Sequence, residues 1–301
     1  MYIFVAKDRQ MIPFLRLIRL PNLFIIVLTQ YCIRIYLDFS TYPNITIPDF
    51  NFFLLSLSTV MIAAAGYIIN DYFDIKPDLI NKPQKVIVGH GVKRRVAMGA
   101  HLVINTIGIL LGFYAFWTIG KTSFGFIHVI IAGLLWFYST TYKKQFIVGN
   151  IVVAFLASVV VIIVGLFEPQ LVMKIVLAYA GFAFIISLIR EIVKDMEDME
   201  GDHEINSKTI PLTLGIDKSK TILYIINGVF ILMISSFQYY LFINNSWIHF
   251  SYILVLLQMP LLSIFWLVHK ANVSKDYHQI SNVLKLAMIT GILAMVVFYY
   301  I

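Results

Sequence analysis

Nine long apolar runs restrict this chain to folds in which most of the polypeptide lies inside a lipid bilayer. A helix of about 20 apolar residues crosses the hydrocarbon core and satisfies its backbone hydrogen bonds internally. Hydrophobic residues make up 60% of the chain and charged residues 13%, whereas a soluble domain has about 25% charged residues. We therefore predict an all-α membrane protein, a bundle of nine transmembrane helices near 22–38, 52–70, 96–118, 122–140, 149–168, 171–189, 220–243, 248–268 and 280–300.

The nine expected helices leave no room for a large soluble part, so we predict a single domain over residues 1–301. The first 19 residues mix Lys and Arg with apolar residues and lack the small-residue cleavage site of a signal peptide. We expect them to form an amphipathic helix at the membrane interface. The single cysteine, Cys32, lies inside an apolar run, so no disulfide is expected.

The distribution of Lys and Arg predicts the orientation of the bundle. Nineteen of these residues fall on one side of the expected spans and two, Lys121 and Lys174, on the other. Cytoplasmic loops carry the excess of positive charge, so we predict a cytoplasmic N-terminus and an outside C-terminus, in the inner membrane if the cell is bacterial. The net charge of +7 is explained in this way, and nucleic-acid binding is not expected.

Two sets of aspartates with the same spacing follow apolar runs on the predicted cytoplasmic side. Both read D-x-x-D-x-x-x-D, and they comprise Asp71, Asp74 and Asp78, and Asp195, Asp198 and Asp202. On a helix, such positions fall within about 60° of one another, so each set would line one stripe of a helix leaving the membrane. Pro77 and Gly201 are predicted to mark where these helices loosen or end.

Three carboxylates on one stripe repel one another, and a hard divalent cation relieves that repulsion. Mg²⁺ takes oxygen ligands and is commonly held by one or two carboxylates together with phosphate oxygens. We therefore predict that the two sets face each other across one site, where Mg²⁺ ions bind a diphosphate. The alternative is a solvated acidic surface, which the repeated spacing on one side disfavours. The chain lacks the EF-hand pattern of a calcium loop and the histidine spacing of a zinc site.

The sequences around the two sets resemble a known family of membrane enzymes. N-D-Y-F-D-I-K-P-D-L-I-N-K-P from Asn70 and R-E-I-V-K-D-M-E-D-M-E-G-D from Arg190 are similar to the two signatures of the UbiA superfamily of intramembrane prenyltransferases. R-L-I-R-L-P-N (16–22) and Y-S-T-T-Y-K-K (138–144) add to the likeness. The resemblance implies a nine-helix bundle whose central cavity is capped by two cytoplasmic motif loops. It also implies Mg²⁺-dependent transfer of a prenyl group from an isoprenyl diphosphate to a lipophilic acceptor.

The resemblance further implies roles for individual residues. The metal ligands would be Asn70, Asp71, Asp74, Asp78, Asp195, Asp198 and Asp202, of which Asp71, Asp74, Asp195 and Asp198 are the catalytic candidates. The diphosphate would be bound by Lys143, Arg190, Lys194 and Tyr138, and the acceptor by Arg19 and Asn22. Arg16 is expected to be an interfacial anchor. Lys85 replaces an arginine frequent in relatives and lacks its bidentate fork, which weakens the case for a role there.

The second signature, followed by T-I-P-L, resembles the branch that makes digeranylgeranylglyceryl phosphate in ether-lipid synthesis. The predicted partners are therefore geranylgeranyl diphosphate, geranylgeranylglyceryl phosphate and the lipid bilayer, with no obligate protein partner. Two alternatives stay open, an aromatic acceptor in quinone biosynthesis and a cation-coupled transporter. A transporter would be expected to place its acids near the bilayer midplane in broken helices, whereas here they lie at span ends.

Five further polar residues lie inside the expected spans, where ionisable groups are costly and are commonly functional. They are Arg34, His101, Asn105, Glu191 and Lys285. We expect each of them to have a partner or a role.

Overall fold

Helices account for almost all of the regular structure. The computed structural model describes residues 12–37 and 49–300. Residues 12–17 are helical, as expected for the interfacial segment. Residues 1–11 of that segment and nearly all of the expected outside loop, 38–49, lie outside the described residues.

The long helices follow the predicted runs. They are α2 (Leu20–Tyr36), α3 (Phe50–Phe73), α5 (Arg94–Thr118), α6 (Phe126–Thr140), α7 (Val148–Phe167), α8 (Met173–Glu197), α11 (Ile216–Ile243), α12 (Trp247–Ile253), α13 (Met259–Lys270) and α14 (Ser274–Tyr300). Within the described part, eight helical segments are long and apolar enough to cross a membrane, with α12 and α13 forming one of them. The helix α2, with 17 residues, is shorter. The count of nine spans therefore stays a prediction.

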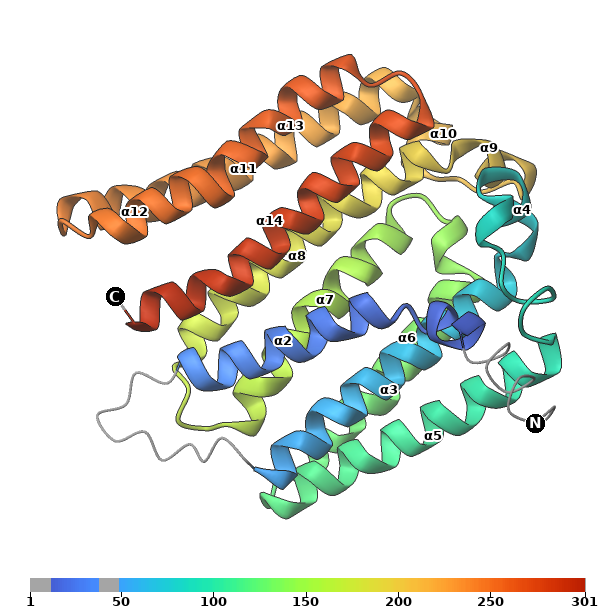
Figure 1. Ribbon diagram of the computed structural model, residues 1–301, viewed down its shortest axis with the longest axis horizontal. Coiled ribbons are helices and arrows are strands. Elements are labelled where there is room, and N and C mark those ends of the chain that lie inside the picture. Colours follow the sequence, from blue (N-terminus) through green and yellow to red (C-terminus); the bar gives the residue numbers. More distant parts are fainter. Residues whose placement is uncertain (1–11, 38–48, 301) are drawn as a thin grey trace, which may run out of the picture.

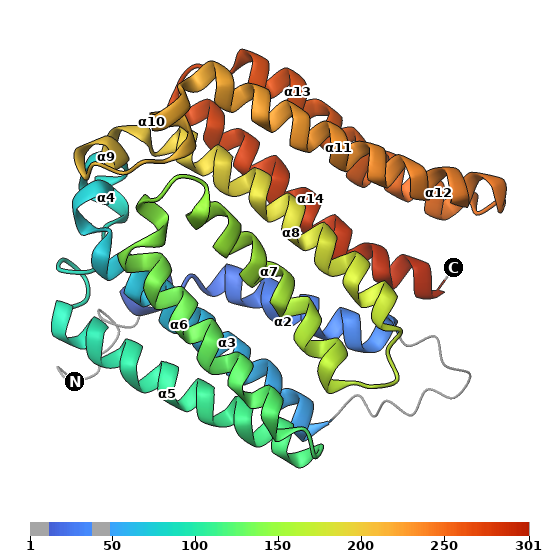
Figure 2. The same cartoon turned by 180° about the vertical axis from the view of Figure 1, so that it is seen from behind.

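The long helices run side by side as rods, and the short helices α4 (Ile75–Asn81), α9 (Met199–Glu204) and α10 (Ile210–Leu214) gather at one end (Figures 1 and 2). Helix α3 packs on α5, α7 packs on α8, and α14 packs between α8 and α2. Large apolar side chains remain exposed on the outer helices, such as Leu110, Leu232 and Trp266. A soluble protein rarely exposes so much apolar surface, so these faces contact lipid and the protein is an integral, multi-pass membrane protein.

A π-helical segment, Leu254–Gln258, joins α12 to α13. Pro260 follows it and has no backbone N–H, so the carbonyl of Leu256, four residues earlier, loses its usual donor. The hydroxyl of Thr290 on α14 donates a hydrogen bond of 2.8 Å to that carbonyl. The neighbouring helix therefore supplies the hydrogen bond that the irregular segment lacks, as is required for backbone groups inside a lipid bilayer.

The two aspartate-bearing helices break earlier than the sequence predicted. Helix α3 ends at Phe73, and α4 (Ile75–Asn81) begins after Asp74; α8 ends at Glu197, and α9 (Met199–Glu204) begins after Asp198. Each break thus lies at the middle aspartate of its set, and each helix ends four residues before Pro77 or Gly201. The prediction that the helices loosen or end at these two residues is wrong, and each set spans a bend rather than one continuous helical stripe.

The four-residue offset has a physical reason in both places. Pro77 cannot donate to the carbonyl of Phe73, and its ring clashes with that carbonyl. Gly201 has an N–H, but it donates to the side-chain oxygen of Asn81 at 2.8 Å. Each helix therefore ends at the residue whose carbonyl lacks its usual hydrogen bond from the N–H four residues later, which is Phe73 in α3 and Glu197 in α8.

Candidate active site

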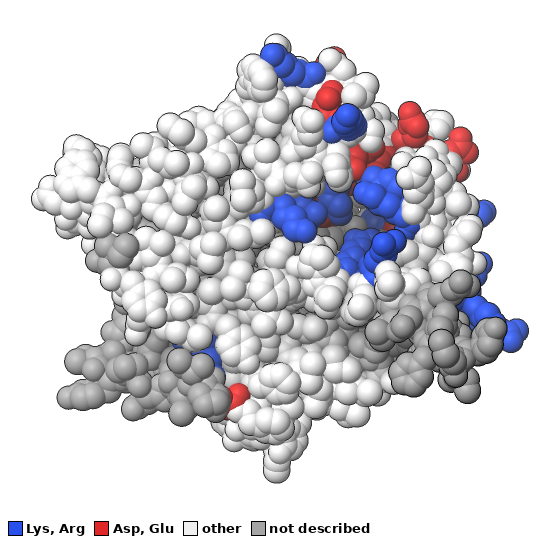
Figure 3. All heavy atoms as spheres, viewed as in Figure 1, with Lys and Arg blue, Asp and Glu red and all other residues white. Residues whose placement is uncertain are grey.

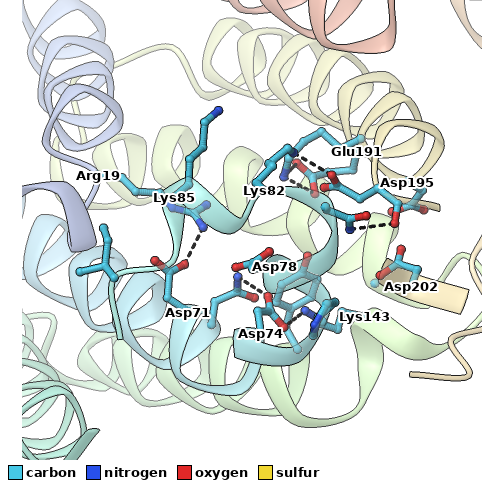
Figure 4. Close-up of a pocket in the computed structure, with 18 of the residues that line it drawn as sticks. Arg19, Asp71, Asp74, Asp78, Lys82, Lys85, Lys143, Glu191, Asp195 and Asp202 are labelled. Carbon is cyan, nitrogen blue, oxygen red and sulfur yellow. Dashed lines mark hydrogen bonds and ion pairs between the residues drawn. The ribbon is translucent and has the colours of Figure 1, made fainter. Parts of the chain in front are cut away.

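Both aspartate sets line one cavity of about 570 Å³ at the end of the bundle where α4 and α9 lie. Figure 4 shows Asp71, Asp74 and Asp78 facing Asp195 and Asp202 across this space. Basic side chains lie among them, and the lining also includes Arg19, Lys82, Lys85, Lys143 and Lys194. Two stretches more than 100 residues apart in the sequence are thus brought together.

The first set is held by α2 and by the loop after α6. A guanidinium nitrogen of Arg19 donates to Asp71 at 2.7 Å. The amide of Asn70 donates to one oxygen of Asp74 at 2.7 Å, and the ammonium of Lys143 pairs with the other oxygen. Two of the three carboxylates therefore already contact cations.

The second set is held by α7 and by the segment after α4. The amide of Asn150 donates to Asp195 at 2.8 Å. The Lys82 ammonium lies 2.7 Å from Asp198 and 2.8 Å from Glu197, so it joins the first motif loop to the second. Burial opposes the charge on Lys82, but Asp198 and Glu197 outweigh it and raise the pKa of Lys82.

Asn81 fastens the two motif loops by a reciprocal pair of hydrogen bonds. Its amide nitrogen donates to the backbone carbonyl of Asp198 at 2.9 Å, and its oxygen accepts from the N–H of Gly201 at 2.8 Å. A Cβ at position 201 would lie 2.4 Å from Asn81 and 2.5 Å from the carbonyl of Pro77. Only glycine therefore lets α4 and α9 approach this closely.

Backbone geometry also positions the cations. Arg19 caps α2 with a left-handed backbone (φ 53°), a conformation that is costly for a residue with a side chain and that clusters at functional sites. Gly149 lies against the backbone of Lys143, because a Cβ there would be 2.8 Å from the Lys143 Cα. The position of Lys143 is thus fixed by its main chain as well as by Asp74.

Crowding of carboxylates shifts their titration. Burial raises the pKa of Asp78 to about 6, and the charges of Asp71 and Asp198 add to that shift. Burial also raises the pKa of Asp202 to about 6, against the attraction of Lys143. Burial, together with neighbouring lysines, lowers the pKa of Lys143 to about 8. The cavity therefore has acids that are poorly neutralised and would gain from binding a cation.

The donor set suits Mg²⁺ in combination with phosphate. Among the described residues, no three acidic, histidine or cysteine side chains converge closely enough to hold a metal ion alone. Mg²⁺ commonly binds one or two carboxylates plus substrate phosphates, and each aspartate set offers such a group. The buried Oδ1 of Asn70 has no hydrogen-bond partner among the described residues. This oxygen is therefore free to bind a metal ion beside Asp71 and Asp74.

The predicted diphosphate and acceptor residues fall into two groups. Lys143, Lys194, Tyr138 and Arg19 line the cavity. Arg190 and Asn22 are outside its lining; Arg190 lies 3.6 Å from Glu191, and Asn22 lies in a second pocket described below.

Sequence reasoning assigned no role to Asn150, Asn81, Lys82 or Glu197. Asn81, Lys82 and Glu197 lie within the quoted motifs and Asn150 follows one of them, but their partners are on distant segments, which no spacing rule reveals.

The chain matches the UbiA prenyltransferase family over residues 35–299. It is 33% identical over 249 residues to the digeranylgeranylglyceryl phosphate synthase of Saccharolobus solfataricus, covering 80% of this chain and 82% of that protein. It is 34% identical over 168 residues to the synthase of the same name from Methanothermobacter thermautotrophicus, covering 56% of this chain and 57% of that protein.

Two solved structures share the architecture. One, described as digeranylgeranylglyceryl phosphate synthase in membranes, superposes with a TM-score of 0.66 at 23% identity and covers 96% of this chain and 98% of that chain. The other, a UbiA homologue from Archaeoglobus fulgidus bound to GPP and Mg²⁺, superposes with a TM-score of 0.61 at 16% identity and covers 94% and 99%. At these identities the likeness concerns the fold. With the sequence match over most of its length, the protein is a membrane-embedded member of the UbiA prenyltransferase family.

Proposed function

We propose that this enzyme transfers a geranylgeranyl group from geranylgeranyl diphosphate to a glycerol hydroxyl of geranylgeranylglyceryl phosphate, in a Mg²⁺-dependent reaction of ether-lipid synthesis. The observation that carries the proposal is one cavity that is lined by both aspartate sets and by six Lys and Arg side chains. The curated relatives named digeranylgeranylglyceryl phosphate synthase support the choice of acceptor. The structural neighbour that binds GPP and Mg²⁺ supports the donor class and the metal.

The two aspartate sets would hold the metal ions, with Asn70 and Asp78 completing the ligands on the first side. Bound Mg²⁺ would supply charge that stabilises the departing diphosphate. Lys143, Lys194 and Tyr138 would contact the same phosphates from α8 and from the end of α6. The ion pairs of Asp71 with Arg19 and of Asp74 with Lys143 keep these acids neutralised until metal and diphosphate bind.

The reaction breaks the bond between C1 of the prenyl chain and the diphosphate oxygen, which leaves with the electron pair. The resulting allylic cation is attacked by the acceptor hydroxyl oxygen, which forms the new ether bond. The hydroxyl proton passes to a carboxylate of the cavity. Preorganised charges in a largely buried site stabilise the separating ions far more than bulk water would.

We also propose that the cavity opens to the cytoplasm and that the whole chain forms one domain. The aspartate sets and the Lys- and Arg-rich loops that follow them lie at one end of the bundle. The distribution of positive charge favours a cytoplasmic location for that end, which would place the C-terminus on the other side.

The test is to incubate purified enzyme with labelled donor and Mg²⁺, and with a panel of glycerol-phosphate and aromatic acceptors. We expect the ether product from the glycerol phosphate, and a loss of at least about 100-fold in Asp71→Asn and Asp195→Asn. Glu200→Gln, an exposed acid of α9 outside the cavity lining, is the matched control and should keep wild-type activity. Exclusive prenylation of an aromatic acceptor would overturn the assignment to ether lipids.

A further inference from the structure

A second pocket, of about 490 Å³, opens beside the first between the start of α2 and the side of α14. It is lined by Ile12, Leu15, Arg16, Arg19, Leu20, Pro21, Asn22 and Lys285. Arg16 and Arg19 line both cavities, so the two spaces adjoin. Figure 3 shows Lys and Arg side chains gathered around a hollow on this face, with acidic side chains visible inside it.

The lining of this second pocket contains three cations and no carboxylate. Arg19 is paired with Asp71 of the neighbouring cavity. Among the described residues, Lys285 donates to a neutral group, the side-chain oxygen of Asn22, at 3.0 Å and has no acidic partner. Arg16 has no acidic side chain within ion-pair distance in the described part of the chain. Within residues 12–37 and 49–300, two cations thus face the pocket without a counter-ion.

Lys285 lies well inside α14, one of the helices long and apolar enough to cross the membrane. An ionised lysine at such a position is expensive and marks a functional site by default. On the neighbouring helix α8, Arg190 lies 3.6 Å from Glu191, and its buried Nε has no hydrogen-bond partner among the described residues. A cluster of cations at the lipid boundary is stable once an anion enters it.

The residue types of the lining favour a phosphate monoester over a metal-bound diphosphate. Without carboxylates the pocket cannot hold a metal-bound diphosphate, which needs the aspartate sets next door. A phosphate monoester carries a charge of about −1.5 to −2 at neutral pH, and arginine and lysine are its usual ligands. The exposed side chains of Ile12, Leu15 and Leu20 give the pocket an apolar rim, which suits an anion attached to a hydrocarbon chain.

We propose that this pocket binds the phosphate group of the acceptor lipid through Arg16 and Lys285, with Asn22 orienting the lysine. The inference rests on the proposed function. It adds a site that would let the enzyme distinguish an acceptor lipid with a phosphate group from an uncharged one. A phosphate held here would place the attached glycerol next to the aspartate cavity, because Arg16 and Arg19 are shared by both walls.

The first test compares geranylgeranylglyceryl phosphate with geranylgeranylglycerol, the same lipid without its phosphate. In Lys285→Met and Arg16→Gln, the KM for the phosphorylated acceptor should rise roughly tenfold or more, since each variant removes a hydrogen bond to a charged group. The KM for the donor and the KM for the alcohol should stay near wild-type values. Lys285→Arg should restore most of the affinity. Lys275→Met, an exposed lysine in the first turn of the same helix, is the matched control.

The second test measures binding without catalysis. Both lipids are titrated into wild-type enzyme and Lys285→Met in EDTA, in nanodiscs of zwitterionic lipid and in nanodiscs containing anionic lipid. We expect wild-type enzyme to bind the phosphorylated lipid more tightly than the alcohol, and the variant to lose that preference. The preference should persist in zwitterionic nanodiscs.

Equal binding of the two lipids by the wild-type enzyme would overturn the inference, whatever the activity. A variant effect confined to nanodiscs with anionic lipid would also overturn it, because the pocket would then hold a membrane lipid headgroup. Tight binding of the phosphorylated lipid with no ether product would instead refute the proposed function and leave the anion site standing.

Discussion

Lys143 illustrates how a single cation is positioned at this site. Its ammonium pairs with Asp74, and its backbone is packed against Gly149 at the start of α7. The first contact depends on a flexible side chain, whereas the second depends on main-chain atoms that cannot move aside cheaply. The glycine therefore determines where the charge lies.

We expect Gly149→Ala to impair donor binding although no charge is lost. The added Cβ would approach the Lys143 Cα to 2.8 Å, so the loop must shift, and a misplacement of about 1 Å in a catalytic group can cost up to about 100-fold. Steady-state kinetics with varied geranylgeranyl diphosphate should show a clear rise in KM. Gly133→Ala, which has open space around its Cβ, should leave KM unchanged; equal effects of the two variants would contradict this account.

Metal affinity should fall as the pH drops through about 6. Asp78 and Asp202 have pKa values raised to about 6, so below that pH they are protonated and no longer ligate a cation. Above it both are ionised and affinity is full. Isothermal titration with Mg²⁺ and a diphosphate analogue between pH 5 and 8 checks the direction. Affinity that stays constant over this range would show that neither carboxylate takes part.

For individual residues, the sequence indicated which residue types form the site, but it did not indicate which side chains contact one another. The spacing of the aspartates indicated an oxygen-ligand site, and the structure brings both sets to one cavity. The spacing did not reveal that Asn150 contacts Asp195, because that contact joins helices α7 and α8. His101, an unexplained polar residue in a span, contacts the Ala65 carbonyl at 3.0 Å, a packing role that only the neighbouring helix defines.

The paired helix breaks are the decisive feature at the scale of elements. Each break turns the chain from a membrane helix into a short helix that lies across the cavity, and the Asn81 bridge ties the two short helices together. Pro77 and Gly201 were correctly identified as breakers. Their effect was misplaced by four residues because the opening occurs at the acceptor carbonyl, and because the bond that diverts the Gly201 N–H comes from 120 residues away.

Gly201→Ala should separate α4 from α9 and lower activity more than it lowers stability. The new Cβ would clash with both Asn81 and the Pro77 carbonyl, so the two aspartate sets would move apart. We expect a loss of activity of about 10- to 100-fold, with a thermal midpoint near that of wild type. Gly181→Ala, in α8 with no atom near its Cβ, is the control, and wild-type activity in Gly201→Ala would refute the tethering role.

Across the whole molecule, the end remote from the cavity is closed by a buried ion cluster. Arg34 on α2 donates to Glu168 at 2.6 Å and to Asp49 at 2.7 Å, and its guanidinium lies 4.5 Å from the Phe52 ring centroid. Gln170 donates to the second oxygen of Glu168 at 2.6 Å. Three segments distant in sequence are thereby joined. The apolar pattern predicted the helices but not this cluster, whose members are scattered among hydrophobic residues.

Arg34→Met should destabilise the bundle by about 3–5 kcal/mol, because Glu168 would be left buried without its cation. Unfolding in detergent, followed by tryptophan fluorescence, measures the change. The double variant Arg34→Met/Glu168→Leu should recover part of the loss, since it removes both buried charges. Lys174→Met is the control, and a stability loss of similar size there would mean that the effect is not specific to the cluster.

Next to that cluster, the rings of Phe52 and Phe116 both pack against Phe167, with centroids 6.0 and 5.8 Å from its ring. Phe52 and Phe116 are fully buried. The Arg34 guanidinium lies over the Phe52 ring, so these buried rings back the ion cluster at the end remote from the cavity, and we expect them to keep water from passing along the bundle. A membrane that contains this enzyme should therefore remain electrically tight during turnover, and proteoliposomes should hold a proton gradient as long as empty vesicles do.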